Sequence, residues 1–594
     1  MTRPTRARIG KTVLWWAWMP VSAWLVWAVL HHLFGGVGVW EQWWRLTMVQ
    51  SWWLPGGGLA HPTPLFWLWV AIGLAGTAFI MGGGLDDTYA DRVPPADGAM
   101  VAAGVGAVVV LAVPTFIAVW DNDKDAGRHY SAATVFHTTK GAPPPSSLGY
   151  LLDGARPAGD GCDVRGRHDV PSCVKYDRLE GIRSFEGRTS SFASARAMMQ
   201  HAASPAPKVD AWEPSITYFY GSAPGRSGVW TAILDGSGKA TPTYGIATWD
   251  GKTNNVQVGC RFNVGPNNRF DRAFGGERGN NLRNLLAEKY PDYRYDDDDI
   301  WGYCKGDRPV IVVAVSKLKA IGNRTVDVPA GVLLLEGGRR GVAHRHLADV
   351  RPGQLPGPVY PDSLVERQTE ATAWAAGRKW KQRASFGFKP TTDDVQAGNT
   401  SEYLLRGPDR RLYYVTPLSP NASRSQAFIA YAVTPADTVA SGRLNRMDVY
   451  VLPDGDRRVA NLNTLVAQAT DAVRTTDPTF LNTRGELEEF TPLGGDMWRV
   501  FGVRRGITEF YVDLSATGRT APRTVAVAGS RPDGDTSGGN TPAGDAPGGA
   551  PSPSPSSSPG AGACGKPPER MSEREIADCM TALGEELRKR GPGR

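Results

Sequence analysis

An uncharged run of 22 residues, 99–120, constrains this chain more than any other feature of its sequence. At a rise of about 1.5 Å per residue, a helix of that length crosses the roughly 30 Å hydrocarbon core of a bilayer. We therefore predict a transmembrane helix over 99–120. Two further apolar runs, 13–34 and 65–84, predict two more spans. Together they give a three-helix transmembrane anchor at the N-terminus.

Basic residues at the start of the chain predict its orientation. The four that precede the first run are Arg3, Arg6, Arg8 and Lys11. Positive charge beside a span favours the cytoplasmic side, so we expect residues 1–12 to be cytoplasmic. The Trp-rich loop 35–64 then lies outside, the short loop 85–98 lies in the cytoplasm, and residues 121–594 are extracytoplasmic. The sequence thus predicts a multi-pass protein of the plasma membrane.

All six cysteines follow the third predicted span. They are Cys162, Cys173, Cys260, Cys304, Cys564 and Cys579. An even number on one side of a membrane favours disulfides in an oxidising compartment, although six cysteines allow 15 pairings. Proximity in the chain favours 162 with 173, 260 with 304, and 564 with 579. A zinc site is the weaker alternative, because no two cysteines have the short spacing that zinc sites use.

The region after the predicted anchor shows a repeated order of elements. Residues 121–186, rich in Gly, Pro and charge, are expected to be a stalk. Residues 187–350 predict a helix, an antiparallel meander with Gly-containing turns, a second helix and closing strands. Residues 358–520 predict the same order and end in a hairpin around 504–506. We therefore predict the α+β class, with two extracytoplasmic lobes built on antiparallel sheets, and leave open whether the lobes are a duplication.

The C-terminal region changes composition abruptly. Residues 529–563 are almost entirely Gly, Pro, Ser, Thr and Asp, which predicts a disordered linker. Residues 564–594 predict a short amphipathic helix. Its apolar face consists of Ile576, Met580, Leu583 and Leu587. An isolated helix of this length needs a partner surface, so these residues are candidates for partner binding.

The search for chemistry gives few candidates. The sequence holds no Gly-rich phosphate loop, no H-E-x-x-H and no G-x-S-x-G, so we predict no catalytic, cofactor-binding or metal-binding residues and no cofactor. Ser316 and Lys319 match S-x-x-K, without the accompanying motifs of that enzyme class. His344 and His346 alternate on one side of an extended segment, but two histidines alone make a weak metal site.

One aromatic and acidic segment, 290–301, is the best candidate for a partner surface. It combines Tyr290, Tyr293, Tyr295 and Trp301 with Asp296, Asp297, Asp298 and Asp299. Aromatic side chains dominate the energetics of protein interfaces. The four aspartates could also hold a hard cation, but they lack the spacing of a calcium loop, so a solvated acidic loop is the preferred interpretation.

In layout the chain resembles uncharacterised actinobacterial multi-pass membrane proteins. The shared features are a short basic N-terminus, a few spans, a large cysteine-containing exterior and a Pro/Ser tail. Some such proteins accompany conjugation or secretion machinery. The resemblance carries no specific motif and assigns no role to any residue.

These observations favour a non-enzymatic, membrane-anchored scaffold or binding protein of the cell envelope, as in a conjugation or secretion assembly. Its expected partners are the membrane, other envelope proteins or further copies of itself. The net charge of +7 is mild and dispersed, so we expect no nucleic-acid binding. The alternatives are an envelope enzyme acting on wall polymer or glycan, and an oligomeric transporter or channel subunit. The small-molecule ligand stays open.

Overall fold

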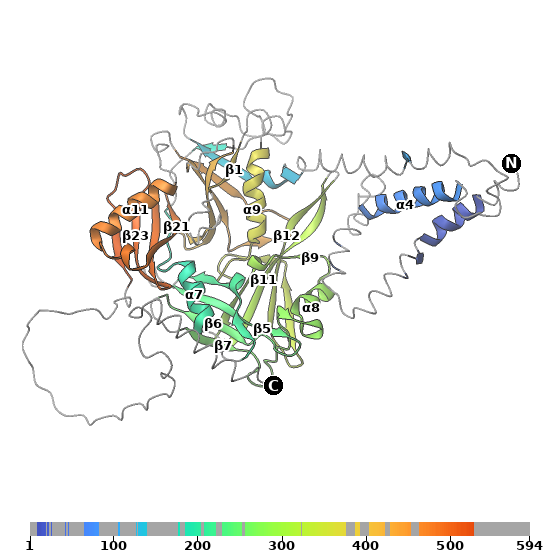
Figure 1. Cartoon of the computed structure of the whole chain (residues 1–594), viewed down its shortest axis with the longest axis horizontal. Helices are drawn as coiled ribbons and strands as arrows, with labels where there is room; N and C mark the ends of the chain where they lie inside the picture. Colours follow the sequence, from blue (N-terminus) through green and yellow to red (C-terminus); the bar gives the residue numbers. More distant parts are fainter. Residues whose placement is uncertain are drawn as a thin grey trace, which may run out of the picture. The chain divides into compact units, whose positions relative to one another are not determined.

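The computed structural model describes residues 9–19, 64–81, 126–138 without 128, and most of 184–527 (Figure 1). The gaps in the last range are 203–206, 221–227, 252–255, 322–323, 376–386, 392–402, 422–427 and 453–461. Residues 21, 22, 25, 42, 46, 105, 106 and 176–178 are also described. Contacts divide the chain into two compact units, Met1–Pro532 and Asp533–Arg594, and every described residue belongs to the first.

The prediction of a three-helix transmembrane anchor is wrong. Within the described residues, no helix is both long enough and apolar enough to cross a membrane. Helix α4 (Pro64–Met81) falls on the second predicted span, and residues 82–84 of that span lie outside the described residues. The runs 13–34 and 99–120 are described only in part.

Helix α4 contacts Trp15 and Trp16 through a hydrogen bond and through ring packing. The indole nitrogen of Trp16 donates a hydrogen bond to the Thr77 hydroxyl at 3.0 Å. Gly73 and Gly76 lie against the rings of Trp16 and Trp15, so the absence of a Cβ at these glycines permits the close approach. The predicted localisation depended on this anchor, and it is wrong for the same reason. It was a multi-pass protein of the plasma membrane with residues 121–594 extracytoplasmic.

The first group of strands is a six-stranded sheet. Its strands are β3 (Val209–Ala211), β4 (Thr217–Phe219), β5 (Val229–Gly238), β6 (Gly245–Trp249), β7 (Gln257–Arg261) and β8 (Gly275–Gly276). Strands β5, β6 and β7 pair antiparallel in sequence order, which confirms the predicted meander. Helix α7 (Phe192–Ala202) packs on this sheet through the buried Ala195 and Met199.

The second group is a five-stranded sheet. Its strands are β9 (Tyr293–Arg294), β10 (Ile300–Lys305), β11 (Arg308–Ile321), β12 (Arg324–Gly337) and β13 (Val342–Leu347). The closing strands predicted for residues 187–350 are confirmed as β11 and β12, an antiparallel pair. Helix α8 (Leu282–Lys289) precedes them and begins at Asn281, whose side chain accepts a hydrogen bond from the Asn284 amide at 2.8 Å.

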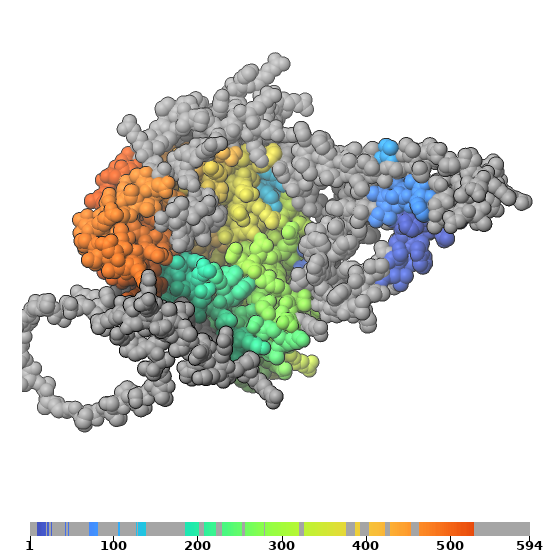
Figure 2. Space-filling view, in the orientation of Figure 1, coloured from blue at the N-terminus to red at the C-terminus, as the bar shows by residue number. Residues whose placement is uncertain are grey.

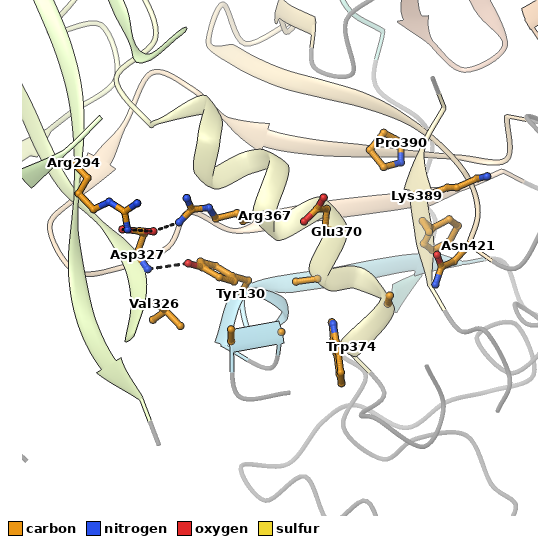
Figure 3. A pocket seen from close by; sticks show the side chains of 15 residues that line it. Tyr130, Arg294, Val326, Asp327, Arg367, Glu370, Trp374, Lys389, Pro390 and Asn421 are labelled. Carbon is orange, nitrogen blue, oxygen red and sulfur yellow. Dashed lines mark hydrogen bonds and ion pairs between the residues drawn. The ribbon is translucent and has the colours of Figure 1, made fainter. Parts of the chain in front are cut away.

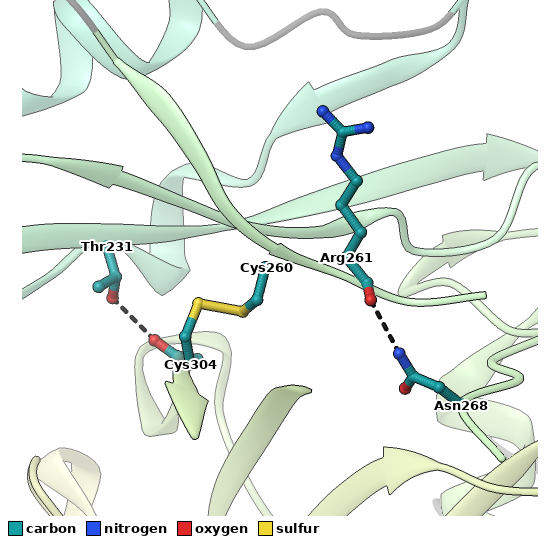
Figure 4. The surroundings of a disulfide bond; sticks show 6 residues. Thr231, Cys260, Arg261, Asn268 and Cys304 are labelled. Carbon is teal, nitrogen blue, oxygen red and sulfur yellow. Dashed lines mark hydrogen bonds between the residues drawn. A yellow bond between two sulfur atoms is a disulfide. The ribbon is translucent and has the colours of Figure 1, made fainter. Parts of the chain in front are cut away.

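A disulfide between Cys260 and Cys304 joins these two sheets (Figure 4). Cys260 lies on β7 and Cys304 on β10, with Cα atoms 5.8 Å apart. The Thr231 hydroxyl of β5 also donates to the Gly302 carbonyl of β10 at 2.8 Å. The pairing expected from chain proximity is thus confirmed, whereas Cys162, Cys173, Cys564 and Cys579 lie outside the described residues.

The second half of the chain begins with α9 (Asp362–Ala371), which continues as a short 3-10 helix, η6 (Thr372–Trp374). A seven-stranded sheet follows: β15 (Phe388–Pro390), β16 (Tyr403–Arg406), β17 (Leu412–Pro420), β18 (Ala430–Pro435) and β20 (Met447–Val451), with β1 (Thr134–Thr138) and β2 (Tyr176–Arg178). Strand β1 comes from the segment predicted as a stalk and pairs in parallel with β20. The His137 ring lies 2.8 Å from an Asp448 carboxylate oxygen across this pairing.

The last sheet is a four-stranded meander with one helix. It consists of α11 (Leu462–Thr476), β21 (Gly485–Gly494), β22 (Met497–Arg504), β23 (Ile507–Ser515) and β24 (Arg523–Ala526). The hairpin between β22 and β23 turns at Arg505 and Gly506, both with positive φ, as a tight type I′ turn requires. Figure 2 shows this sheet and its helix, in orange, beside α7. The Ser194 hydroxyl of α7 lies 2.8 Å from the Thr508 hydroxyl of β23.

The fold class therefore differs from the predicted α+β arrangement with its anchor. The described chain consists mostly of small antiparallel sheets, completed by the short pair β14 (Asp349–Val350) and β19 (Val439–Ala440). One buried apolar cluster includes Trp301 and Val312 together with Leu364 and Tyr414. The two predicted lobes thus share a core in the described structure.

Candidate functional site

A cavity of about 730 Å³ lies between α9 and the strands around it (Figure 3). The residues that line it are Ala126, Gly127, Tyr130, Arg294, Val326, Asp327, Arg367, Glu370, Ala371, Ala373, Trp374, Phe388, Lys389, Pro390 and Asn421. Small-molecule sites in proteins commonly have volumes of about 300–1,000 Å³. The cavity is therefore large enough for a ligand of ordinary metabolite size.

A buried carboxylate stands at one end of the cavity. Asp327 belongs to β12, and only 6% of its side chain is exposed. Both of its oxygens accept from Nη1 of Arg294, at 3.2 and 3.3 Å, and one also accepts from Nη1 of Arg367. A buried carboxylate is stable only when paired, which explains why two arginines converge on it.

The arginine pair carries more positive charge than Asp327 neutralises. The side chains of Arg294 and Arg367 are 42% and 35% exposed, so both also face the cavity. Burial, with the charge of Arg367 as the next cause, lowers the pKa of Arg294. A guanidinium nevertheless stays charged at neutral pH, and each one uses only Nη1 on Asp327, so Nη2 and Nε of both arginines have no hydrogen bond to a described residue.

Three elements hold this cluster in place. Arg294 lies on β9, which pairs with β11, and Asp327 lies on the neighbouring strand β12. The Asp327 amide donates to the Tyr130 hydroxyl at 2.8 Å, which fixes the strand against the residues around 130. Arg367 projects from α9, whose buried face packs through Leu364 and Val365.

Two further charged groups face the cavity without a partner in the described structure. Glu370 lies three residues after Arg367 on α9, so both point to the same side of the helix. Arg367 pairs with Asp327 instead of Glu370, and the described residues supply no hydrogen bond or ion pair to the Glu370 carboxylate. Lys389 on β15 is likewise unpaired among them. In Figure 3, Glu370 lies between the arginine pair and Lys389.

An apolar wall completes the cavity. The indole of Trp374 lies against Gly127, where a Cβ would overlap the ring, so this contact requires glycine. Ala371, Ala373 and Phe388 add further apolar surface. The cavity thus combines charged groups at several points with a flat aromatic surface, the usual composition of a small-molecule site.

The aromatic segment predicted to bind a partner is divided by the structure. Tyr290 and Tyr293 are partly exposed and stack at 5.7 Å, with an angle of 7° between their rings. Trp301 is buried and donates to the Pro358 carbonyl at 2.7 Å, so it is a core residue. Tyr295 is half-buried, and burial raises its pKa to about 12.

The two histidines considered as a weak metal pair join the tyrosines. The Tyr290 hydroxyl lies 2.8 Å from Nδ1 of His344, and that of Tyr293 lies 3.5 Å from Nδ1 of His346. Nε2 of His346 donates to the Ala330 carbonyl at 2.7 Å. The ring nitrogens of His346 are therefore occupied by hydrogen bonds, and partner binding by Tyr290 and Tyr293 stays a prediction.

The aspartate cluster has a structural role at one of its members. Asp299 is 4% exposed and accepts from the Asp362 amide at 2.7 Å and from the Ser363 hydroxyl at 3.0 Å. It thereby caps the N-terminus of α9, although burial raises its pKa to about 7. Asp297 pairs with Arg283 at 2.7 Å. In the part of the chain that the structure describes, no three side chains of the ligating types gather in a metal-binding cluster.

The remaining sequence candidates lie apart from the cavity or outside the described residues. Ser316 and Lys319 are three residues apart on β11 and so point to opposite faces of the sheet, which separates a nucleophile from its base. The C-terminal residues Ile576, Met580, Leu583 and Leu587, the linker 529–563 and all but two residues of 35–63 lie outside the described range.

The cavity itself was not predicted. Its charged residues come from segments near 294, 327, 367 and 389, which no local pattern connects. One signal was present: Asp327 lies between two valines in a mostly apolar strand, and a charge at a buried position needs a partner. Comparisons with protein-family models, with curated proteins and with solved structures give no match. The function is therefore argued from the geometry of the cavity.

Proposed function

We propose that this chain is a binding protein whose cavity takes a small ligand with an anionic group, a carboxylate or a phosphate. The observation that carries the proposal is the convergence of Arg294 and Arg367 on Asp327 at the cavity wall. Two guanidinium groups share one carboxylate, which leaves an excess of one positive charge. An incoming anion would balance that charge.

The geometry of a guanidinium favours such an anion. Its donors form a planar fork that matches the two oxygens of a carboxylate or phosphate. Asp327 holds both forks before a ligand arrives, so little side-chain entropy is lost on binding. Because the arginines are partly buried, water competes less with an anion for their donors, and the charge interaction with the anion is stronger than in open solvent.

Binding is favoured over catalysis by the residue types around the cavity. The described lining residues include no Ser, Cys or His, and the carboxylate and amine that face the cavity, Glu370 and Lys389, have no hydrogen bond to a described residue that would pair a nucleophile with a base. The proposal keeps the binding part of the sequence-based hypothesis and gives it a definite site.

Calorimetric titration of the full chain tests this function. The probes are succinate, inorganic phosphate and the uncharged analogue succinamide. We expect at least one anion to bind and succinamide not to bind. A charge-assisted hydrogen bond contributes about 1.5–3 kcal/mol, so Arg294→Gln and Arg367→Gln should each weaken binding about 10- to 100-fold.

A matched variant distinguishes the cavity from general surface charge. Arg345→Gln removes an exposed arginine on β13 that does not line the cavity, and it should leave the affinity unchanged. Equal losses in all three variants, or no binding of either anion at millimolar concentration, would contradict the proposed function.

A further inference from the structure

Three charged positions alternate in sign along the cavity. The arginine pair is positive, Glu370 is negative and Lys389 is positive, and Glu370 lies between the other two in Figure 3. The anion-binding function accounts for the arginine pair alone. Glu370 would oppose a purely anionic ligand.

Glu370 has an obvious partner that it does not use. Arg367 lies one helical turn before it, a spacing at which Arg and Glu commonly form an ion pair. Asp327 takes the Arg367 guanidinium instead, and Glu370 keeps an exposed carboxylate in the cavity without a partner among the described residues. A cationic group of a ligand would fill that position.

Lys389 extends the pattern on the other side. It projects from β15, the strand that also contributes Phe388 to the apolar wall, and it too has no partner in the described structure. A second anionic group of a ligand would lie against it. The complement of the three positions is therefore anion, cation, anion.

We infer that the ligand is a dicarboxylic amino acid or a close analogue, with one carboxylate on Arg294 and Arg367, the ammonium group on Glu370 and the second anionic group toward Lys389. This inference rests on the proposed function and adds the cationic and second anionic groups to it. The recognition depends on the order of the charges along the cavity, because each unmatched charge opposes the binding of an analogue that lacks the corresponding group.

Calorimetric titration with L-glutamate and three analogues tests the inference on the full chain. Glutarate lacks the ammonium group, 4-aminobutanoate lacks the carboxylate beside it, and 2-aminopentanoate lacks the distal carboxylate. We expect L-glutamate to bind at least about tenfold more tightly than each analogue, as the loss of a charge-assisted hydrogen bond implies.

Two variants assign the groups. In Glu370→Gln the preference for L-glutamate over glutarate should fall to about one, and in Lys389→Met the preference over 2-aminopentanoate should do the same. Glu366→Gln is the matched control: it is the same change on the same helix, at an exposed residue that does not line the cavity. Glu366 interacts electrostatically with Glu370, so this control should change the two ratios far less than the cavity variants do.

The outcomes separate this inference from the proposed function. If glutarate, succinate or phosphate binds as tightly as L-glutamate, the inference is wrong and anion binding stands. If Glu366→Gln changes the ratios as much as Glu370→Gln does, the assignment to Glu370 is wrong. If none of the anions binds, both proposals fail.

Discussion

Removal of the Cys260–Cys304 disulfide should strongly destabilise the described fold. The two cysteines are 44 residues apart in the chain, so the bond closes a long loop. In the chain-entropy model, a loop of about 44 residues loses about 13 cal/mol/K in the unfolded state, or about 4 kcal/mol at 25 °C. Cys260 is also 5% exposed on β7, and β7 pairs only with β6 in the described sheet. We therefore expect the double variant Cys260→Ala/Cys304→Ala to lose about 4 kcal/mol of unfolding free energy.

Urea denaturation followed by circular dichroism measures this loss, with the slope against urea as a check that the unfolded state is comparable. The matched control is Thr231→Val, which removes the hydrogen bond from β5 to Gly302 on β10 and keeps the disulfide. That hydrogen bond should contribute about 1 kcal/mol. A double cysteine variant that loses less than about 1 kcal/mol, or no more than Thr231→Val, would refute the argument that the loop closure holds the two sheets together.

Three other changes have definite expected results. Burial raises the pKa of Glu488 to about 7, so the folded state holds an extra proton between about pH 4.5 and 7, and its stability falls as the pH rises through that range. Glu488→Gln should remove this dependence and be more stable than the parent by about 3 kcal/mol at pH 8. Urea denaturation of both proteins at pH 5 and pH 8 measures this, and an equal change of stability in both would contradict it. Asp299→Ala removes the acceptor at the start of α9 and should cost about 1–3 kcal/mol in urea denaturation, and an unchanged midpoint would contradict the capping role. Gly127→Ala places a methyl group on the Trp374 ring and should cost about 1–3 kcal/mol, whereas an equally stable variant would show that this contact is loose.

The sequence predicted those elements whose signal is local. Alternating apolar residues and Gly-containing turns identify the meander β5–β7, and the turn at Arg505 and Gly506 identifies the β22–β23 hairpin. Helical patterns over 190–203, 280–290, 361–376 and 461–473 predict four helices, and α7, α8, α9 and α11 fall within or close to these ranges. Strand β10 escapes because its sequence, IWGYCK, lies in a segment whose aspartates and tyrosines indicated a surface loop.

The predictions that failed were made from local composition, which carries no information about tertiary contacts. An uncharged run indicates a span from its composition alone, whereas no helix within the described residues is both long enough and apolar enough to cross a membrane. The cavity depends on Arg294, Asp327 and Arg367 meeting across three elements, a fact of tertiary structure that no periodicity contains. The Cys260–Cys304 pairing succeeded because those two cysteines are near each other in the chain as well as in space.

The parallel pairing of β1 with β20 has a consequence for synthesis of the chain. Phe136 pairs with Val449, so the first strand of the seven-stranded sheet meets its neighbour more than 300 residues later. At about 5–20 residues per second, a ribosome needs roughly 15–60 s to produce the intervening chain. During that interval β1 has no β20 beside it, and the nascent protein must keep this strand from pairing elsewhere until its C-terminal half emerges.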